Sequence, residues 1–563
     1  MSLSQQIENE IPAETARVAR ASFRKGNQLM LLRDRFGALF AAEDFSDLYS
    51  WKGEEGINPV LLATTVVLQY VEGLSDVQAV KQVCGRIDWK YLFGVELDYA
   101  GFAASDLSEF RSRLVEQAAA DRLFEKPLSR LKAVGLVKER GQQRTDSTHI
   151  LAAIRTLNRL ELVGETLRHA LNQLAVEARA WLSSWVPATW FERYASRMEE
   201  GKLPQENSKR TQLAHTIAAD GEQLLTVLYD EKTPLYLRQL PAVQVLRQVW
   251  LQQYQVVEGQ LVWREAGNVP PAHLMINSPY DIEARFSRKR TTSWVGGKVH
   301  LTESCDADTP HLLTHIETTT ATEPDFQTLP KIHQALDEKG LLPAEHLIDA
   351  GYVTIDNLVD SQTQHSVELV GPVRPDTSLQ AHQQNGYDIA HFVVDWQTQT
   401  VTCPQGKTSR TWSSSVNHQG DASISVRFHK QDCLACPVRT LCTKAAVQPR
   451  GLHLQASADK HLALQQARLE QQQPAFQQRY QARAGIEGSI SQAVRVFDVR
   501  YARFIGYAKL QLQHFATGAA FNFVRLAAWW HDPKRAQTRT SAFAALAPPS
   551  LHNLTHLAGL PAS

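Results

Sequence analysis

Residues 144–150 have the sequence RTDSTHI, and this stretch decides the fold class. It combines β-forming and small polar residues, so it predicts a strand that carries an acidic side chain, although aspartate is disfavoured inside strands. Segments 294–304 and 313–320 predict a strand pair, 324–336 predicts a helix, and 345–349 predicts a short strand. Strand pairs and helices in this order predict an α/β layer fold.

Helical patterns lie on both sides of this segment. Upstream of about residue 135, Asn58-Pro59 predicts one helix start, Ser75 a second and Ser105 a third. This region predicts a helical domain of the helix-turn-helix type, with a bundle that does not contact DNA as the alternative. The pattern is helical again from 155 to about 263.

The sequence pattern changes twice in the C-terminal half. Residues 366–456 predict short strands and turns around a cluster of cysteines. From Ser457, a predicted N-cap, to Trp530 the pattern is helical. A length of 563 residues is too great for one hydrophobic core, so we expect several domains.

The total charge and the local charge of the chain give opposite indications about a nucleic-acid partner. The net charge is zero, which is a mild argument against a nucleic-acid partner. Between 471 and 540, however, ten Lys or Arg residues face only Glu487, Asp498 and Asp532. Locally concentrated positive charge favours DNA, and a solvated helix face is the alternative.

The sequence indicates a protein without a membrane anchor. No stretch reaches about 18 apolar residues without charges. The first ten residues are polar and carry Glu8 and Glu10, which is not the pattern of a signal peptide. We expect a cytoplasmic protein.

Three acidic residues stand out by context: Asp146, Asp349 and Glu487. Carboxylates gathered from distant segments repel one another unless a cation lies between them, and Mg²⁺ or Mn²⁺ takes such oxygen ligands. Tyr480, Arg483 and Glu487 share one helix face by their spacing. An edge strand for Asp146 and a surface ion pair for Arg483 with Glu487 are the alternatives.

Several motifs occur in order between residues 40 and 530. They are a helical segment from Gly73 to Leu114, TDSTH (145–149), SPYD (278–281), WVGGKVHL (294–301), DAGY (349–352) and Tyr480-x2-Arg483-x3-Glu487. This ordered set resembles bacterial insertion-sequence transposases of the DDE class. The resemblance implies a helical N-terminal domain and a ribonuclease-H-like core, a mixed sheet flanked by helices.

The resemblance also implies the catalytic residues. Asp146 matches the first catalytic aspartate, Asp349 the second and Glu487 the third acid. Together they are expected to hold two Mg²⁺ (or Mn²⁺) ions that assist phosphodiester cleavage and strand transfer. The family often has a Lys seven residues after the Glu, but Val494 stands there and Arg495 follows. Because one residue turns a helical side chain by about 100°, the role of Arg495 in holding DNA stays open.

The expected organisation follows from this resemblance. The predicted segments are an N-terminal helical DNA-binding domain (1–135), the first core strand (136–155), a helical insertion (156–275), the core continued (276–365), a β-rich insertion with the cysteine cluster (366–456), C-terminal core helices with Glu487 (457–533) and a flexible tail (534–563).

Four cysteines predict a structural zinc site. Cys433 and Cys436 form a close pair, while Cys403 and Cys442 complete a set of four thiolates suited to tetrahedral Zn²⁺. Free thiols in a small β segment are the alternative.

The expected partner is double-stranded DNA, both the transposon ends and the target. Two ends must be joined in one complex, so we expect a homodimer on DNA. The residues expected to contact DNA are Tyr480, Arg483, Arg495, Arg500, Arg503, Lys509, Lys298 and Trp294, the last with a core position as its alternative. The rival interpretations are a nuclease or domesticated transposase with the same core, and a zinc-containing DNA-binding regulator without catalysis.

Overall fold

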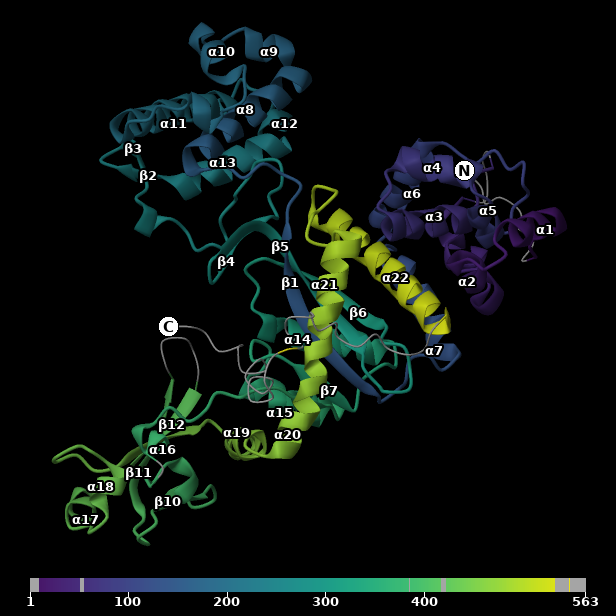
Figure 1. Cartoon of the computed structure of the whole chain (residues 1–563). Helices are drawn as coiled ribbons and strands as arrows, with labels where there is room; N and C mark the ends of the chain where they lie inside the picture. The colour runs from purple at the N-terminus through teal and green to yellow at the C-terminus, as the bar shows by residue number, and fades with distance from the viewer. Residues whose placement is uncertain (1–9, 51–54, 384, 417–421, 532–545, 547–563) are drawn as a thin grey trace.

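The computed structural model describes residues 10–50, 55–383, 385–416, 422–531 and 546. Within this part the chain is a mixed α/β protein with a helical N-terminal region and a curled mixed sheet. Figure 1 shows the sheet at the centre, with a lobe of helices and a lobe of short strands projecting from it. The predicted tail, 534–563, lies outside the described residues except for Leu546.

Local capping sets the N-terminal helices. The side chain of Asn58 accepts from Val60 N, and that of Ser75 accepts from Gln78 N, so these two predicted helix starts are confirmed. The predicted cap at Ser105 is wrong, because Asp106 accepts from Ala103 N and the helix begins one residue before Ser105. The helices are α1 (Ala13–Ser22), α2 (Gln28–Phe36), α3 (Pro59–Glu72), α4 (Asp76–Gly85), α5 (Ile87–Phe93), α6 (Ala104–Glu116) and α7 (Arg122–Ala133).

The central sheet has the order β4-β5-β1-β7-β8, and β6 pairs with β5. β5 runs antiparallel to β1, β4 and β6, whereas β7 runs parallel to both β1 and β8. This arrangement is consistent with a ribonuclease-H-like core. The strands are β1 (Gln142–Leu151), β4 (Arg285–Lys289), β5 (Thr292–Ser304), β6 (Leu313–Thr320), β7 (Glu345–Ile348) and β8 (Glu368–Val370).

Helices pack on the sheet and join it to the N-terminal region. Helix α22 (Tyr507–His531) contacts β6 and also α3 and α7, and α21 (Gly485–Phe497) packs against β1. Helix α14 (Asp325–Glu338) lies against β6 and against α15 (Ile355–His365). Helices α2 to α7, strands β1, β5, β6 and β7, and α22 therefore share one large hydrophobic core.

The helical lobe, α8 to β3, has a core of its own. Its last part departs from the predicted helix, because Tyr254–Trp263 forms an antiparallel hairpin of β2 and β3. The elements are α8 (Arg159–Glu177), α9 (Arg179–Ser183), α10 (Ala188–Tyr194), α11 (Asn207–Tyr229), α12 (Leu235–Gln239), α13 (Pro241–Gln253), β2 (Tyr254–Val257) and β3 (Gln260–Trp263).

The Cys-rich lobe, α16 to β13, packs around a small cluster that includes Phe392, Val426 and Leu452. It is followed by α19 (Ala458–Gln471), whose predicted N-cap Ser457 is confirmed, and by α20 (Pro474–Gln481). The elements of the lobe are α16 (Leu379–His382), β9 (Val393–Asp395), β10 (Thr400–Thr402), β11 (Ser409–Val416), β12 (Ala422–Phe428), α17 (Lys430–Leu434), α18 (Arg439–Cys442) and β13 (Gly451–Gln455).

Among the described helices, no single one is long and apolar enough to cross a membrane; the bent pair α3 and α4 passes this test by length and composition only.

Candidate active site

Strand pairing brings two of the predicted acids together. In the parallel pairing of β1 with β7, Thr145 lies opposite Ile348, so Asp146 and Asp349 follow at neighbouring positions. Asp349 comes directly after β7, and its Oδ1 accepts a hydrogen bond from Gly351 N at 2.8 Å. A Cβ at Gly351 would lie 3.0 Å from that oxygen, so glycine leaves room beside the carboxylate.

The charges around Asp146 oppose one another. Burial raises the pKa of Asp146 to about 6; the charge of Asp349 acts in the same direction and that of Arg483 in the opposite one. The Nη2 of Arg483 donates to Asp146 Oδ2 at 2.6 Å. Two neighbouring carboxylates repel each other, so a cation between them is favoured.

The third acid, Glu487, is connected to this pair through Arg483. The Nη1 of Arg483 donates to Glu487 Oε1 at 3.3 Å, so one guanidinium bridges Asp146 and Glu487. The side chain of Arg483 is 14% exposed, whereas that of Glu487 is 68% exposed. Glu487 is therefore the acid that faces solvent, and Arg483 fills the space behind it.

The Tyr480–Glu487 segment is not one uninterrupted α-helix. α20 ends at Gln481, a 3-10 turn covers Ala482–Ala484, and α21 begins at Gly485. Tyr480 stacks on Phe476 with ring centroids 5.7 Å apart, and burial together with nearby carboxylates raises the pKa of Tyr480. The single helix face predicted from the spacing is therefore interrupted by the 3-10 turn, although the charges of Asp146, Asp349 and Glu487 all act on Tyr480 and on Arg483.

The structure adds a fourth carboxylate that the sequence did not single out. Asp325, in the first turn of α14, accepts from Lys298 Nζ at 2.6 Å and from Ser147 Oγ at 3.5 Å. A Cβ at Gly351 would lie 3.4 Å from Asp325 Oδ2, so Asp325 also borders the space beside Asp349. Lys298, expected to contact DNA, is 13% exposed and has its ammonium in this ion pair.

A buried ion cluster connects the strand that carries Asp146 to the helix that carries Glu487. Glu303 on β5 has a fully buried side chain and accepts from Arg144 Nε, Ser489 Oγ and Arg525 Nη1, each at 2.6 Å. Arg144 lies on β1 and Ser489 on α21. A Cβ at Gly485 would lie 2.0 Å from Arg144 Nη1, so the helix begins directly on that guanidinium.

The remaining predicted DNA contacts differ in exposure. Arg495, Arg503 and Lys509 are exposed, while Arg500 is half-buried and donates to Thr148 Oγ1 at 3.0 Å. The side chain of Trp294 is buried, and its Nε1 donates to Gly297 O at 3.1 Å. Stacking of a base on Trp294 therefore requires β5 to move.

The four clustered cysteines line one cavity of the Cys-rich lobe. Burial raises the pKa of Cys442, the three other thiols act in the same direction, and Arg450 opposes them. The backbone N of Lys407 donates to Cys403 Sγ at 3.4 Å. Across the described part of the chain, however, no group of three or more His, Cys, Asp or Glu side chains has the arrangement of a metal site.

Comparison with known families gives two matches. Residues 17–113 match the model of a Transposase domain (DUF772), and residues 402–527 match that of a Transposase DDE domain. The second match contains Arg483, Glu487 and the four clustered cysteines, while Asp146 and Asp349 lie upstream of it. No curated protein matches the chain.

Proposed function

We propose that this chain, a bacterial DDE-type insertion-sequence transposase, binds the terminal inverted repeats of its element and catalyses metal-dependent DNA cleavage and strand transfer. The observation that carries the proposal is the pairing of β1 with β7, which sets Asp146 beside Asp349. Arg483 then links Asp146 to Glu487.

The donor set fits a hard divalent cation. Asp146, Asp349 and Glu487 offer carboxylate oxygens only, which Mg²⁺ and Mn²⁺ prefer. We assign these three acids as the ligands of two Mg²⁺ (or Mn²⁺) ions, as the family resemblance implies. Bound ions of this kind activate the attacking oxygen and stabilise the leaving oxygen in phosphodiester transfer.

Arg483 has two roles in this proposal. In the metal-free chain its guanidinium offsets the repulsion between the acids, as its contacts with Asp146 and Glu487 indicate. A planar guanidinium also suits bidentate binding of a phosphate, so Arg483 can orient the DNA strand at the acids. Tyr480, whose ring stacks on Phe476, feels the charge of the same guanidinium.

The fold is proposed to be a ribonuclease-H-like core with two insertions. The order and directions of β6, β5, β1, β7 and β8 support this core. The helical lobe enters the chain between β1 and β4, and the Cys-rich lobe enters between β8 and α19. Each lobe has its own hydrophobic cluster, which supports their assignment as insertions.

DNA is proposed to contact the exposed cations Arg495, Arg503 and Lys509, which follow the catalytic Glu487 in the sequence. Such contacts position the duplex without specifying its sequence. Two copies of the chain are proposed to hold two transposon ends together, because strand transfer joins both ends to one target.

The Cys-rich lobe is proposed to hold a structural Zn²⁺ ion through Cys403, Cys433, Cys436 and Cys442. Their shared cavity and the N–H donated to Cys403 Sγ support this assignment. The ion would close the lobe and take no part in cleavage.

A binding and cleavage assay tests the proposed function. Labelled DNA that carries the element's own ends is incubated with the full chain in Mg²⁺ and, in parallel, in EDTA. We expect binding of end DNA in preference to scrambled DNA, cleavage that requires Mg²⁺, and joined products when target DNA is added. If the chain binds end DNA but does not cut it in either Mg²⁺ or Mn²⁺, the result would favour a DNA-binding regulator over an enzyme.

A further inference from the structure

A basic hairpin projects from the sheet next to the acids. The basic hairpin, defined as residues 285–296, consists of β4 and the first part of β5, paired from Arg285 with Gly296 to Lys289 with Thr292. β5 pairs with β1 only from Gly296 onward and with β6 only from Gly297 onward. Residues 292–295 therefore pair with no strand other than the edge strand β4, and Val295 O accepts from Ala152 N at 3.0 Å, just after β1 ends.

Two glycines set the direction of the basic hairpin. Gly296 has φ +155°, and a Cβ there would lie 2.0 Å from Ile150 O. A Cβ at Gly297 would lie 2.9 Å from Thr319 O. The chain passes so close to both neighbouring strands at this point that only glycine fits, so the WVGGK motif fixes the angle at which the basic hairpin leaves the sheet.

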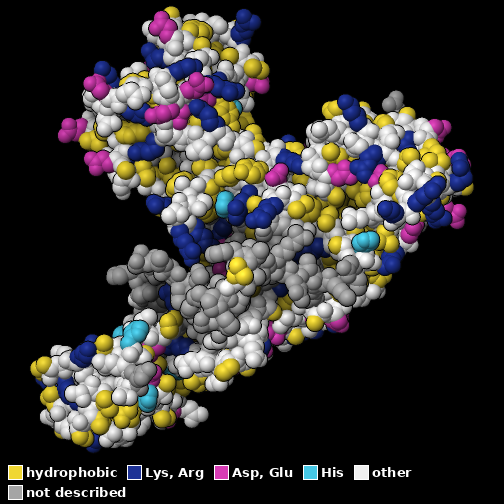
Figure 2. Space-filling view, viewed as in Figure 1, with side chains coloured by type: hydrophobic (Ala, Val, Ile, Leu, Met, Phe, Trp, Pro, Cys, Tyr) yellow, Lys and Arg dark blue, Asp and Glu magenta, His cyan; other side chains and the backbone are white. Residues whose placement is uncertain are grey.

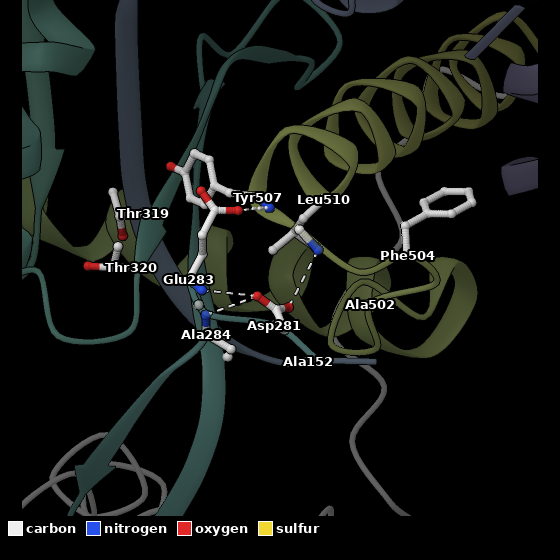
Figure 3. Close-up of a pocket in the computed structure, with 13 residues that line it drawn as sticks. Ala152, Asp281, Glu283, Ala284, Thr319, Thr320, Ala502, Phe504, Tyr507 and Leu510 are labelled. Carbon is white, nitrogen blue, oxygen red and sulfur yellow. Dashed lines mark hydrogen bonds between the residues drawn. The ribbon is translucent and has the colours of Figure 1, made fainter. Parts of the chain in front are cut away.

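The base of the basic hairpin is anchored to α22. Glu283 Oε2 accepts from Tyr507 N at 2.6 Å, and Asp281 Oδ2 accepts from Gly506 N at 3.4 Å. Asp281 Oδ1 also accepts from Ala284 N at 3.2 Å. Figure 3 shows these two carboxylates between the start of α22 and the strand that begins at Arg285. The basic hairpin is thus held at its base by the same helix that packs on the sheet.

The tip carries positive charge only. Residues 285–296 contain four cations and no acidic residue. The guanidinium of Arg285 bonds to His273 O at 2.9 Å and stays at the base. Arg288, Lys289 and Arg290 are exposed at the tip, and none of them forms an ion pair within the described part of the chain. Arg288 Nε donates to Arg290 O at 3.1 Å, but no carboxylate of the described residues forms an ion pair with the three tip cations, so a polyanion is the ligand that they favour.

The basic hairpin lies on the strand that neighbours Asp146. β5 pairs with β1, where Leu301 lies opposite Asp146, and the same strand continues back through Gly296 into the basic hairpin. Figure 2 shows Lys and Arg side chains at the inner edge of the hollow between the two projecting lobes, where Figure 1 labels β4.

We propose that the basic hairpin is a DNA clamp: Arg288, Lys289 and Arg290 bind backbone phosphates next to the bond that is cut. This inference rests on the proposed function, because it places the same DNA substrate at the same acids. The clamp positions the DNA backbone, and its cations contact phosphates other than the one that reacts.

The test compares two triple variants of the full chain. R288A/K289A/R290A removes the tip charges, and R179A/K232A/R247A removes three exposed cations of the helical lobe, so both variants lose equal charge. Binding of labelled end DNA is measured across a salt series. We expect the slope of log K against log salt to fall by about one for each phosphate that the tip variant no longer binds, and to stay unchanged in the control.

A crosslinking measurement locates the clamp on the DNA. A K289C variant is reacted with end DNA that carries a bromoacetylated phosphorothioate at a single position, and we expect crosslinks only at phosphates adjoining the cleaved bond. A wild-type chain that cuts its ends, together with a tip variant of unchanged salt slope and no such crosslinks, would overturn the clamp and leave the proposed function standing. A wild-type chain that neither binds nor cuts its ends would overturn both.

Discussion

Two regions of this chain gather proposed metal ligands from separate segments, and they do so by different means. Asp146 lies within β1 and Asp349 directly after its partner β7, and a buried ion cluster around Glu303 connects the helix that carries Glu487 to the same sheet. The four clustered cysteines instead sit on turns and on the short helices α17 and α18 around a small core.

The difference bears on what a metal would do in each proposed site. Strand pairing and ion contacts hold the acids in place, so we expect a cation there to serve the chemistry and to add little to the fold. The cysteines lie on turns and short helices around a small cluster, so we expect a cation there to stabilise the fold and to take no part in the chemistry.

Removal of zinc should have the largest effect, and it should be confined to the Cys-rich lobe. Structural zinc contributes roughly 10 kcal/mol to folding in small zinc domains. We expect a C433S/C436S variant to lose amide protection in β9 to β13 while β1, β5 and β7 stay protected, as followed by hydrogen exchange. C84S, which changes an exposed cysteine of the N-terminal region, is the control. Absence of zinc from the purified chain, with unchanged protection in the variant, would contradict the assignment.

The next largest effect is expected at Glu303. Glu303→Ala leaves the guanidiniums of Arg144 and Arg525 buried without their carboxylate, which should cost about 3–5 kcal/mol of unfolding free energy. Urea denaturation measures this cost, and Glu177→Ala on the exposed end of α8 is the control. An unchanged urea midpoint for Glu303→Ala would mean that the ion cluster does not hold the catalytic region.

Two glycines of α21 give a matched pair with opposite signs. Gly485→Ala places a Cβ 2.0 Å from Arg144 Nη1 and should destabilise the chain by about 1–3 kcal/mol. Gly488→Ala meets nothing within 4 Å and should stabilise by up to about 1 kcal/mol, because alanine favours the helix. The two variants are compared by thermal unfolding and DNA cleavage. Equal effects at the two positions would show that the contact with Arg144 does not matter.

The smallest effect is the pH dependence of metal binding. The pKa of Asp146 is raised to about 6, so a proton occupies the carboxylate below that pH and must leave when a cation binds. Apparent Mn²⁺ affinity should therefore be level above pH 7 and fall by up to about tenfold per unit below pH 6. Calorimetric titration with Mn²⁺ in two buffers that differ in ionisation enthalpy measures how many protons are released on binding. Affinity that stays constant from pH 5 to 7 would contradict the charged role of Asp146.

The sequence indicates the strands of the sheet well, for a physical reason. Segments 294–304 and 313–320 combine β-branched residues with turn signals at their ends, and the structure places β5 and β6 there. β4 was missed because Arg285–Lys289 is charged at three of five positions and lies at an edge, where no apolar alternation is required. The β2–β3 hairpin was missed because it follows directly on α13 without a break in the helical pattern.

The candidate acids could be named from the sequence, but their partners could not. An aspartate inside a predicted strand is unusual enough to attract attention, as Asp146 did. Asp325 looks like an ordinary first-turn residue of a helix, and only the fold brings it to Lys298. Glu303 was also missed, because its ion-pair partners Arg144 and Arg525 lie far from it in the sequence, one on each side. Long-range pairing of this kind leaves no local signal.

One cleavage assay determines most directly whether Asp146, Asp349 and Glu487 are the catalytic acids. Labelled end DNA is incubated in Mg²⁺ with the wild type, with D146A, D349A and E487A, and with D360A, which changes an exposed acid of α15. We predict that the wild type and D360A cut at the ends, whereas the three acid variants bind the DNA and cut roughly a thousand-fold more slowly or not at all. An acid variant that cuts at the wild-type rate would contradict the claim at that position.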